Sequence, residues 1–267
     1  MSFYDSGSLS SVNSPTKYRA IVTYDGTSYN GWQAQKDLPS IESTLKTVFK
    51  RAFGVPVFSL IAASRTDAGV HANGQVLLFK HILQLDPDKL LKIMNDHLPF
   101  DIHFKAVCYA PPNFHPWYNV SMKEYHYLFS FNRPLPMYSR FIQYVRASFD
   151  IERFKEALRL FVGTYNFSQF ATDSSQKSTA ELVKKIDSIT VEYDSSIQAW
   201  RIRIQGKSFL RHMIRRIVGA AAYVAGKNQD GLSCIETALY HQKRVVEFPT
   251  AHACGLVLES VFYHERL

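Results

Sequence analysis

The order of apolar patterns along the chain repeats, and this repeat limits the possible folds more than any other sequence feature. In the first half, residues 17–24 alternate between apolar and polar side chains, and residues 41–52 follow with helical spacing. Alternation is typical of half-buried strands, whereas recurrence every three to four residues is typical of an amphipathic helix. Further strands are expected at 57–63, 75–79 and 102–109, and a second helix after Asp86-Pro87. The predicted order is βαββαβ.

The second half contains the same order of patterns. Strands are expected at 122–131, 183–193, 199–205 and 256–263, and helices at 150–161, 209–225 and, as an insertion, near 232–240. Two copies of a split βαβ unit, each with helices on one face of an antiparallel sheet, are the simplest arrangement with this order. We therefore predict an α+β protein with two similar ferredoxin-like halves, residues 17–110 and 111–267, and a basic cleft between them.

The ends and the composition of the chain favour a cytoplasmic protein. Residues 1–16 are rich in Ser and are predicted to be a disordered tail. A transit peptide is the alternative, but such peptides are rich in Arg and poor in acids, whereas this stretch has Asp5 and no Arg. The chain has no run of about 18 apolar residues, so no membrane partner is expected. Its three Cys lack C-x-x-C spacing and its His lack H-x-x-H spacing, so neither a metal nor a cofactor is predicted.

The charge of the chain is unevenly distributed. The formal net charge is +8, and the stretch from Ser195 to Gln229 contains no acidic residue. The basic residues of this stretch are Arg201, Arg203, Lys207, Arg211, Arg215, Arg216 and Lys227. Such a region is suited to a polyanion such as RNA. A solvated basic face without a partner would have the same composition, so the charge alone leaves both interpretations open.

The segment from Ser64 to Ala72 reads S-R-T-D-A-G-V-H-A and lies between two apolar strands. An isolated Asp two residues before Gly is common in turns, where the carboxylate binds local amides. The whole segment, however, resembles the signature of the TruA family of tRNA pseudouridine synthases, which carries the catalytic aspartate. Asp67 is the residue that matches it.

Other segments extend the resemblance over residues 17 to 263. They are Y-D-G-T at 24–27, N-G-W-Q-A-Q at 30–35, F-H at 114–115, K-E-Y-H-Y at 123–127, F-L-R-H-M-I-R at 209–215 and G-L-V-L at 255–258. The chain departs from the family pattern at Trp117, where Arg is usual, at His252, where Pro is usual, and at Arg211, which is often Tyr. These departures concern the placement of RNA rather than the catalytic acid.

The resemblance implies that the chain isomerises uridine to pseudouridine at positions 38 to 40 in the anticodon arm of tRNA. The enzyme would be a homodimer whose RNA contacts both subunits. The reaction breaks the bond from N1 to C1′, turns the base and joins C1′ to C5. It needs a carboxylate near the sugar, either as a nucleophile at C1′ or as a base toward the 2′ position, and both roles remain open for Asp67.

The resemblance also assigns three substrate-binding residues. Arg215 would pair with Asp67, because a nearby cation favours an ionised carboxylate in an enclosed site; a phosphate contact or a surface charge is the alternative. Tyr125 would stack on the flipped base and is a candidate for proton removal at C5, the alternative being ordinary strand packing beside Tyr127. Arg65 would support flipping, because its planar guanidinium can stack and contact phosphate. His71 is expected to be structural.

Two other functions compete with the isomerase. A non-catalytic tRNA-binding protein could keep the same fold, but the joint presence of Asp67, Tyr125 and Arg215 favours an enzyme. Hydrolysis of the glycosidic bond would need a second carboxylate that positions water, and the loop around Asp67 offers none.

Overall fold

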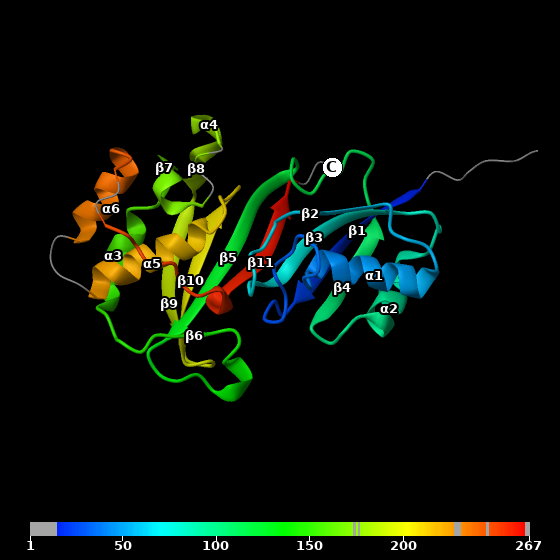
Figure 1. Cartoon of the computed structure of the whole chain (residues 1–267), viewed down its shortest axis with the longest axis horizontal. Coiled ribbons are helices and arrows are strands. Elements are labelled where there is room, and N and C mark those ends of the chain that lie inside the picture. Colours follow the sequence, from blue (N-terminus) through cyan, green and yellow to red (C-terminus); the bar gives the residue numbers. More distant parts are fainter. Residues whose placement is uncertain (1–14, 173–174, 176, 227–230, 244–245, 265–267) are drawn as a thin grey trace, which may run out of the picture.

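The structure is a computed structural model that describes residues 15–172, 175, 177–226, 231–243 and 246–264. It is elongated, with helices lying against strands along its length (Figure 1). Residues 1–14 of the predicted tail lie outside the described residues. Thr16 is already part of the first strand, so the prediction of a disordered tail is wrong at that residue.

The first half follows the predicted order. Its elements are β1 (Thr16–Tyr24), α1 (Ile41–Phe53), β2 (Ser59–Ala62), β3 (His71–His81), α2 (Pro87–His97) and β4 (Ile102–Tyr109). Ser40 caps α1 by accepting a hydrogen bond from the Ser43 amide, and Gly54 ends the helix with a φ of 70°. Asp86 caps α2 ahead of Pro87 in the same way. The capping residues seen in the sequence therefore set both helix starts.

The second half contains more elements than predicted. They are β5 (Val120–Ser130), β6 (Gln143–Tyr144), α3 (Ile151–Arg159), β7 (Gly163–Asn166), α4 (Thr179–Leu182), β8 (Val183–Ile186), β9 (Ser188–Asp194), β10 (Ala199–Gly206), α5 (Met213–Gly226), α6 (Gly231–Tyr240) and β11 (Leu256–Tyr263). The single strand expected at 183–193 is two strands, because β8 pairs with β7 and only β9 pairs with β10. The break falls at Asp187, whose amide donates to the Gln205 carbonyl at 2.8 Å.

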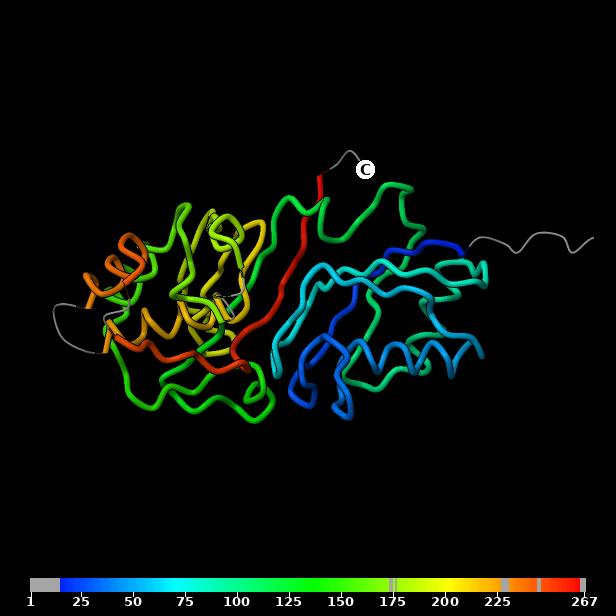
Figure 2. Tube along the Cα trace, turned by 45° about the horizontal axis from the view of Figure 1, so that its top comes forward, coloured from blue at the N-terminus to red at the C-terminus, as the bar shows by residue number. Residues whose placement is uncertain are grey.

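Nine of the described strands form one long sheet that runs through both halves, and β7 and β8 form a separate sheet of two strands, whereas one sheet in each half was expected. The order in the long sheet is β4-β1-β3-β11-β5-β10-β9, with β2 also paired to β3 and β6 to β5. Within the halves the orders are β4-β1-β3-β2 and β11-β5-β10-β9, so corresponding strands occupy corresponding places. The halves join where β11 runs parallel to β3, with Val257 opposite His71 and Leu258 opposite Ala72. Figure 2 shows β11 (red) passing between the two halves. The α+β class with a mainly antiparallel sheet is confirmed.

One face of the sheet is apolar and covered by helices. Tyr18 and Val22 of β1 and Tyr127 of β5 are fully buried, as the alternating pattern predicts. One large core of buried side chains extends through both halves, and a second, small cluster contains Ala63, Val76, Leu78 and Phe114. The opposite face carries partly exposed charged residues, among them Arg203, which lies 2.9 Å from Glu192. Within the described residues, no helix is both long and apolar enough to cross a membrane.

Candidate active site

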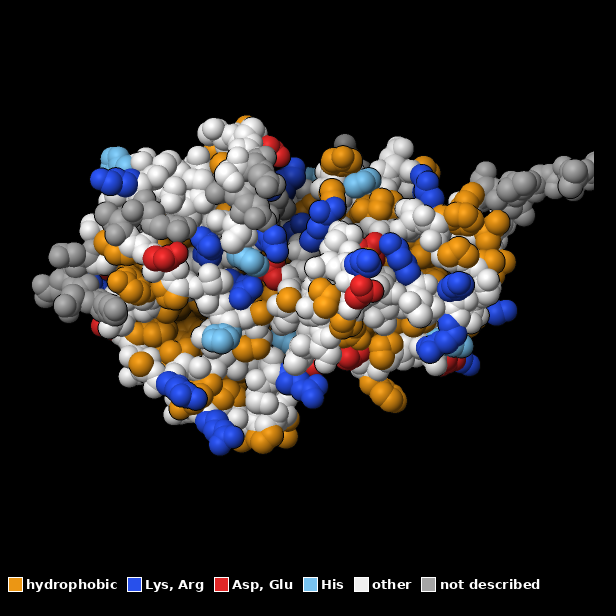
Figure 3. Space-filling view, viewed as in Figure 1, with side chains coloured by type: hydrophobic (Ala, Val, Ile, Leu, Met, Phe, Trp, Pro, Cys, Tyr) orange, Lys and Arg blue, Asp and Glu red, His pale blue; other side chains and the backbone are white. Residues whose placement is uncertain are grey.

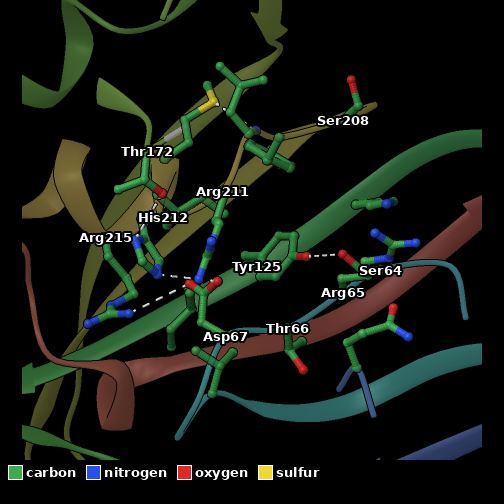
Figure 4. Close-up of a pocket in the computed structure, with 18 of the residues that line it drawn as sticks. Ser64, Arg65, Thr66, Asp67, Tyr125, Thr172, Ser208, Arg211, His212 and Arg215 are labelled. Carbon is green, nitrogen blue, oxygen red and sulfur yellow. Dashed lines mark hydrogen bonds and ion pairs between the residues drawn. The ribbon is translucent and has the colours of Figure 1, made fainter. Parts of the chain in front are cut away.

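The two halves enclose a cavity of about 1170 Å³ where their strands join. The loop between β2 and β3 lines one side, and Tyr125 of β5 and the start of α5 line the other (Figure 4). The volume exceeds the range of about 300–1,000 Å³ of typical small-molecule sites, so the cavity can admit more than an isolated base. The predicted cleft between the halves is therefore present.

The cavity is strongly basic. Its described lining contains six basic residues, Arg65, Lys123, Lys177, Lys207, Arg211 and Arg215. Asp67 is the one acidic residue in that described lining. Figure 3 shows Lys and Arg side chains gathered on this face in the middle of the molecule. Part of the basic stretch lies elsewhere, because Arg201 pairs with Asp194 and Arg203 with Glu192 away from the cavity.

The loop that carries Asp67 is held by a tight turn from the first half. The Trp32 amide donates to the Thr66 carbonyl at 3.0 Å, and the Gly69 amide donates to the Tyr29 carbonyl at 3.2 Å. Gly31 has a φ of 85°, and a Cβ there would lie 2.6 Å from the Thr66 carbonyl oxygen. A side chain at this position would therefore push the loop away.

A buried polar network fixes the beginning of the same loop. The Gln75 side chain is fully buried; it accepts a hydrogen bond from the Ser64 amide at 3.1 Å and donates to the Ser64 carbonyl at 2.7 Å. It also donates to the Tyr24 hydroxyl, which is 2.8 Å from the Thr66 hydroxyl. Burial raises the pKa of Tyr24 to about 12, so this phenol stays neutral. Ser64 and Thr66, on either side of Arg65, are thus anchored from β3 and β1.

Asp67 is held between two side chains from the other half. Arg215 Nη1 lies 3.6 Å from Asp67 Oδ2, and His212 Nε2 lies 3.6 Å from Asp67 Oδ1. Asp67 and Arg215 are each 17% exposed, which leaves the pair open to the cavity but shielded from bulk water. Figure 4 shows both contacts converging on the carboxylate. The ion pair expected from the sequence is present.

Arg215 is braced from behind. Its Nε donates to the Ala251 carbonyl at 2.8 Å, and its own carbonyl accepts from the Ala251 amide at 3.0 Å. This close approach depends on Gly219 one turn along α5, because a Cβ there would lie 2.0 Å from the Pro249 carbonyl oxygen. The segment before β11 therefore docks directly on the helix backbone and orients the guanidinium.

Tyr125 is buried, with 6% of its surface exposed, and its hydroxyl lies 2.6 Å from the Ser64 hydroxyl. Its ring meets Phe209 edge to face, with centroids 5.3 Å apart. Burial raises the pKa of Tyr125, and the Ser64 hydrogen bond only partly offsets this. Tyr125 thus packs as a strand residue and also lines the cavity, so the two readings of its sequence are compatible.

Arg65 is exposed at the other end of the cavity. Its guanidinium lies over the Trp117 ring, 5.3 Å from the centroid. The Trp117 indole in turn donates to the Ala62 carbonyl at the end of β2. The aromatic residue at this departure from the family pattern therefore supports Arg65 through a cation–π contact.

Lys123 is a cavity residue that the sequence analysis did not single out. Its Nζ donates to the Ala63 carbonyl at 2.6 Å, next to the loop that carries Asp67. Burial lowers the pKa of Lys123 to about 8. Its place in the strand pattern, two residues before Tyr125 on the same face, was the available signal.

His212 also lines the cavity, and the sequence analysis quoted it only as part of the motif at 209–215.

His71 lies outside the cavity. Its Nδ1 accepts a hydrogen bond from the Gly26 amide at 3.0 Å, in keeping with a structural role. Among the described residues, no group of His, Cys, Asp and Glu is arranged to hold a metal ion.

Comparisons with known proteins agree with this geometry. The family model described as tRNA pseudouridine synthase matches residues 20–119 and 157–264. The tRNA pseudouridine synthase A of the Aster yellows witches'-broom phytoplasma is 32% identical over 248 residues, covering 92% of this chain and 98% of the relative. That of Thermodesulfovibrio yellowstonii is 33% identical, again over 92% of this chain and 98% of the relative.

One solved structure, an archaeal box H/ACA sRNP Nop10-Cbf5 complex, matches 82% of this chain and 54% of that chain, with a TM-score of 0.33 and 8% identity, and this likeness is too weak to support an inference. The family model covers more than half of the chain, and it spans both the loop of Asp67 and the helix of Arg215. The family expected from the motifs is confirmed: the chain belongs to the tRNA pseudouridine synthases.

Proposed function

We propose that this protein isomerises uridine to pseudouridine at positions 38 to 40 in the anticodon arm of tRNA, with Asp67 as its catalytic carboxylate. The observation that carries the proposal is the Asp67–Arg215 pair, which lines a basic cavity in a chain of this family. The basic lining provides the attraction for a phosphate backbone. The position of the target uridines rests on the sequence resemblance.

The reaction conserves atoms. The N1–C1′ bond breaks, a C5–C1′ bond forms, C5 loses a proton and N1 gains one. Asp67 would act either by attacking C1′ as the base leaves or by removing a proton from the 2′ position. In both cases Arg215 provides a positive charge 3.6 Å from Asp67 Oδ2.

The target base must leave its stack to reach Asp67, at a cost of a few kcal/mol. Tyr125 and Arg65 both line the cavity, where Tyr125 would contact the flipped base and Arg65 would hold the space or the phosphates that the base leaves. The size of the cavity supports a bound nucleotide together with its flanking backbone.

The decisive experiment maps pseudouridine by mass spectrometry after chemical labelling in unmodified tRNA transcripts. Wild-type protein and Asp67→Asn are compared, because Asn keeps the size of the side chain and removes its charge. Pseudouridine at positions 38 to 40 with the wild type alone is the expected result. Intact tRNA binding without product from the wild type would leave the second candidate, a tRNA-binding protein of the same fold.

The remaining expectations belong to the same proposal. We propose a homodimer that acts on tRNA in the cytoplasm, on the basis of the family resemblance. Sedimentation of the protein alone and with tRNA measures the first point directly. A monomer in both conditions would contradict it.

A further inference from the structure

His212 lines the cavity and has an unusual backbone conformation. Its φ is 60°, in the left-handed region that residues other than Gly rarely adopt. The described residues include three other such positions, Asp37, Gln198 and Gln242, and none of these lines the cavity. Strained residues of this kind persist where the surroundings hold them, often at functional sites. His212 immediately precedes α5, which begins at Met213, and its imidazole faces Asp67.

The imidazole is held on both of its nitrogens. Nδ1 lies 3.2 Å from the Thr172 hydroxyl, and Nε2 lies 3.6 Å from Asp67 Oδ1. Figure 4 shows the His212 ring between Thr172 and Asp67, with a contact to each. The Thr172 amide also donates to the Arg211 carbonyl at 3.2 Å, so Thr172 is fixed against the turn that carries His212.

The carboxylate of Asp67 can only accept a hydrogen bond, so a neutral ring that bonds to it carries its proton on Nε2. The Thr172 hydroxyl can donate or accept, and it then donates to Nδ1. The distance of 3.6 Å is longer than the usual range of about 2.7–3.2 Å. Catalytic hydrogen bonds are often long without substrate and shorten in the complex.

Burial and the neighbouring arginines favour the neutral form of His212, whereas Asp67 opposes it. The charged groups that face the ring come from several elements. They are Asp67, Arg211, Arg215 and Arg216 in direct electrostatic contact, with Lys177 and Lys207 in the lining of the same cavity. Burial lowers the pKa of His212 from its ordinary value of 6.5; Asp67 raises it, and the three arginines lower it further. The carboxylate thus has one cationic partner, Arg215, and one neutral donor. A second cation would weaken the carboxylate as a nucleophile or base.

We propose that His212 is a positioning residue whose Nε2–H donates a hydrogen bond to Asp67 Oδ1, while the Thr172 hydroxyl donates to Nδ1 and so stabilises this tautomer. The inference rests on the proposed function and deepens it. Arg215 lies beside Oδ2 of the carboxylate, whereas His212 sets the orientation of the second oxygen, Oδ1. The oxygen that reacts is then presented in one direction regardless of whether it attacks C1′ or removes a proton.

The test compares His212→Phe, which has no donor, with His212→Gln, whose amide can place a donor near the position of Nε2. Single-turnover rates of pseudouridine formation and tRNA dissociation constants are measured for both, with thermal unfolding to show that each variant folds. We expect His212→Phe to lose at least about ten-fold in rate with tRNA affinity within about two-fold, and His212→Gln to recover most of that loss. Equal rates for wild type and His212→Phe would overturn the proposal.

Nuclear magnetic resonance of ¹⁵N-labelled His gives a readout without RNA. The His212 ring should be the Nε2–H tautomer in the wild type and a tautomer mixture in Thr172→Val, with Thr172→Ser unchanged. Asp67→Asn should lower the pKa of His212, because Asp67 raises it in the wild type. A pKa unchanged in Asp67→Asn, or an Nδ1–H tautomer in the wild type, would refute the pairing. Absence of pseudouridine with wild-type protein would instead remove the proposed function, and this inference with it.

Discussion

The hydroxyl of Tyr125 lies 2.6 Å from the hydroxyl of Ser64, so the strand that presents the ring and the loop that carries Asp67 are joined by one hydrogen bond. Ser64 is itself fixed through its backbone by Gln75. The position of the phenol in the cavity therefore depends on the same loop as the Asp67 carboxylate.

Replacing Ser64 with Ala should release the Tyr125 hydroxyl and lower the single-turnover rate about five-fold, since a hydrogen bond of this kind contributes about 1 kcal/mol. The effect should vanish when Tyr125 is already Phe, because the partner is then absent. Rates for both single variants and the double variant form the cycle. Additive losses would show that Ser64 acts independently of Tyr125.

Gln75 should be costly to replace by Leu. The change leaves the Ser64 amide, the Ser64 carbonyl and the Tyr24 hydroxyl without their buried partner, and each unsatisfied group costs about 1–3 kcal/mol. We expect the free energy of unfolding in urea to fall by about 3 kcal/mol or more. Gln205→Leu is the control, because Gln205 bonds Glu124 and Ser188 on the partly exposed face. A similar loss in both variants would contradict the network as the cause.

Gly219→Ala should damage the site from a distance. Its new methyl would meet the Pro249 carbonyl oxygen and displace the segment that braces Arg215. We expect a loss of about 1–3 kcal/mol in unfolding free energy, as for overpacked interiors, together with slower pseudouridine formation. Gly226→Ala in the same helix is the matched control, because among the described residues its methyl would meet only Phe149 Cβ, at 3.9 Å. Similar behaviour of the two variants would argue against the close approach.

Lys123 should make the free energy of unfolding depend on pH in the alkaline range. The pKa of Lys123 is lowered from 10.5 to about 8 by burial, so the unfolded chain binds more protons than the folded one between those values. Stability contributed by this residue therefore rises as pH increases from about 8 to 10.5. In Lys123→Met that rise should be missing when unfolding free energies are compared at pH 8 and pH 10. Parallel pH profiles for the two proteins would disprove a shifted Lys123.

Local signals predicted much of the fold. The caps Ser40 and Asp86 and the alternating runs defined the first half, because their causes lie within a few residues. The start of α5 was predicted at Phe209 and lies at Met213, since the left-handed backbone of His212 ends the approach turn and leaves no trace in apolar spacing. The union of the two sheets depends on Val257 pairing with His71, a contact across most of the chain that no local pattern encodes.

The site shows the same division. Asp67, Arg215, Tyr125 and Arg65 were found through motifs, and all four line one cavity. His212 and Lys123 stood within those motifs but looked ordinary, because their distinguishing properties are a backbone angle and burial. Such properties arise only when the halves come together.

The parallel junction of β11 with β3 bears on how such a protein meets its substrate. Backbone hydrogen bonds and a shared core join the two halves. The halves therefore do not form two domains that open and close about a flexible linker. The carboxylate and its arginine come from opposite sides of that junction and are already in register. In the proposed reaction the protein therefore keeps its conformation, and the RNA must bend to bring a uridine to Asp67.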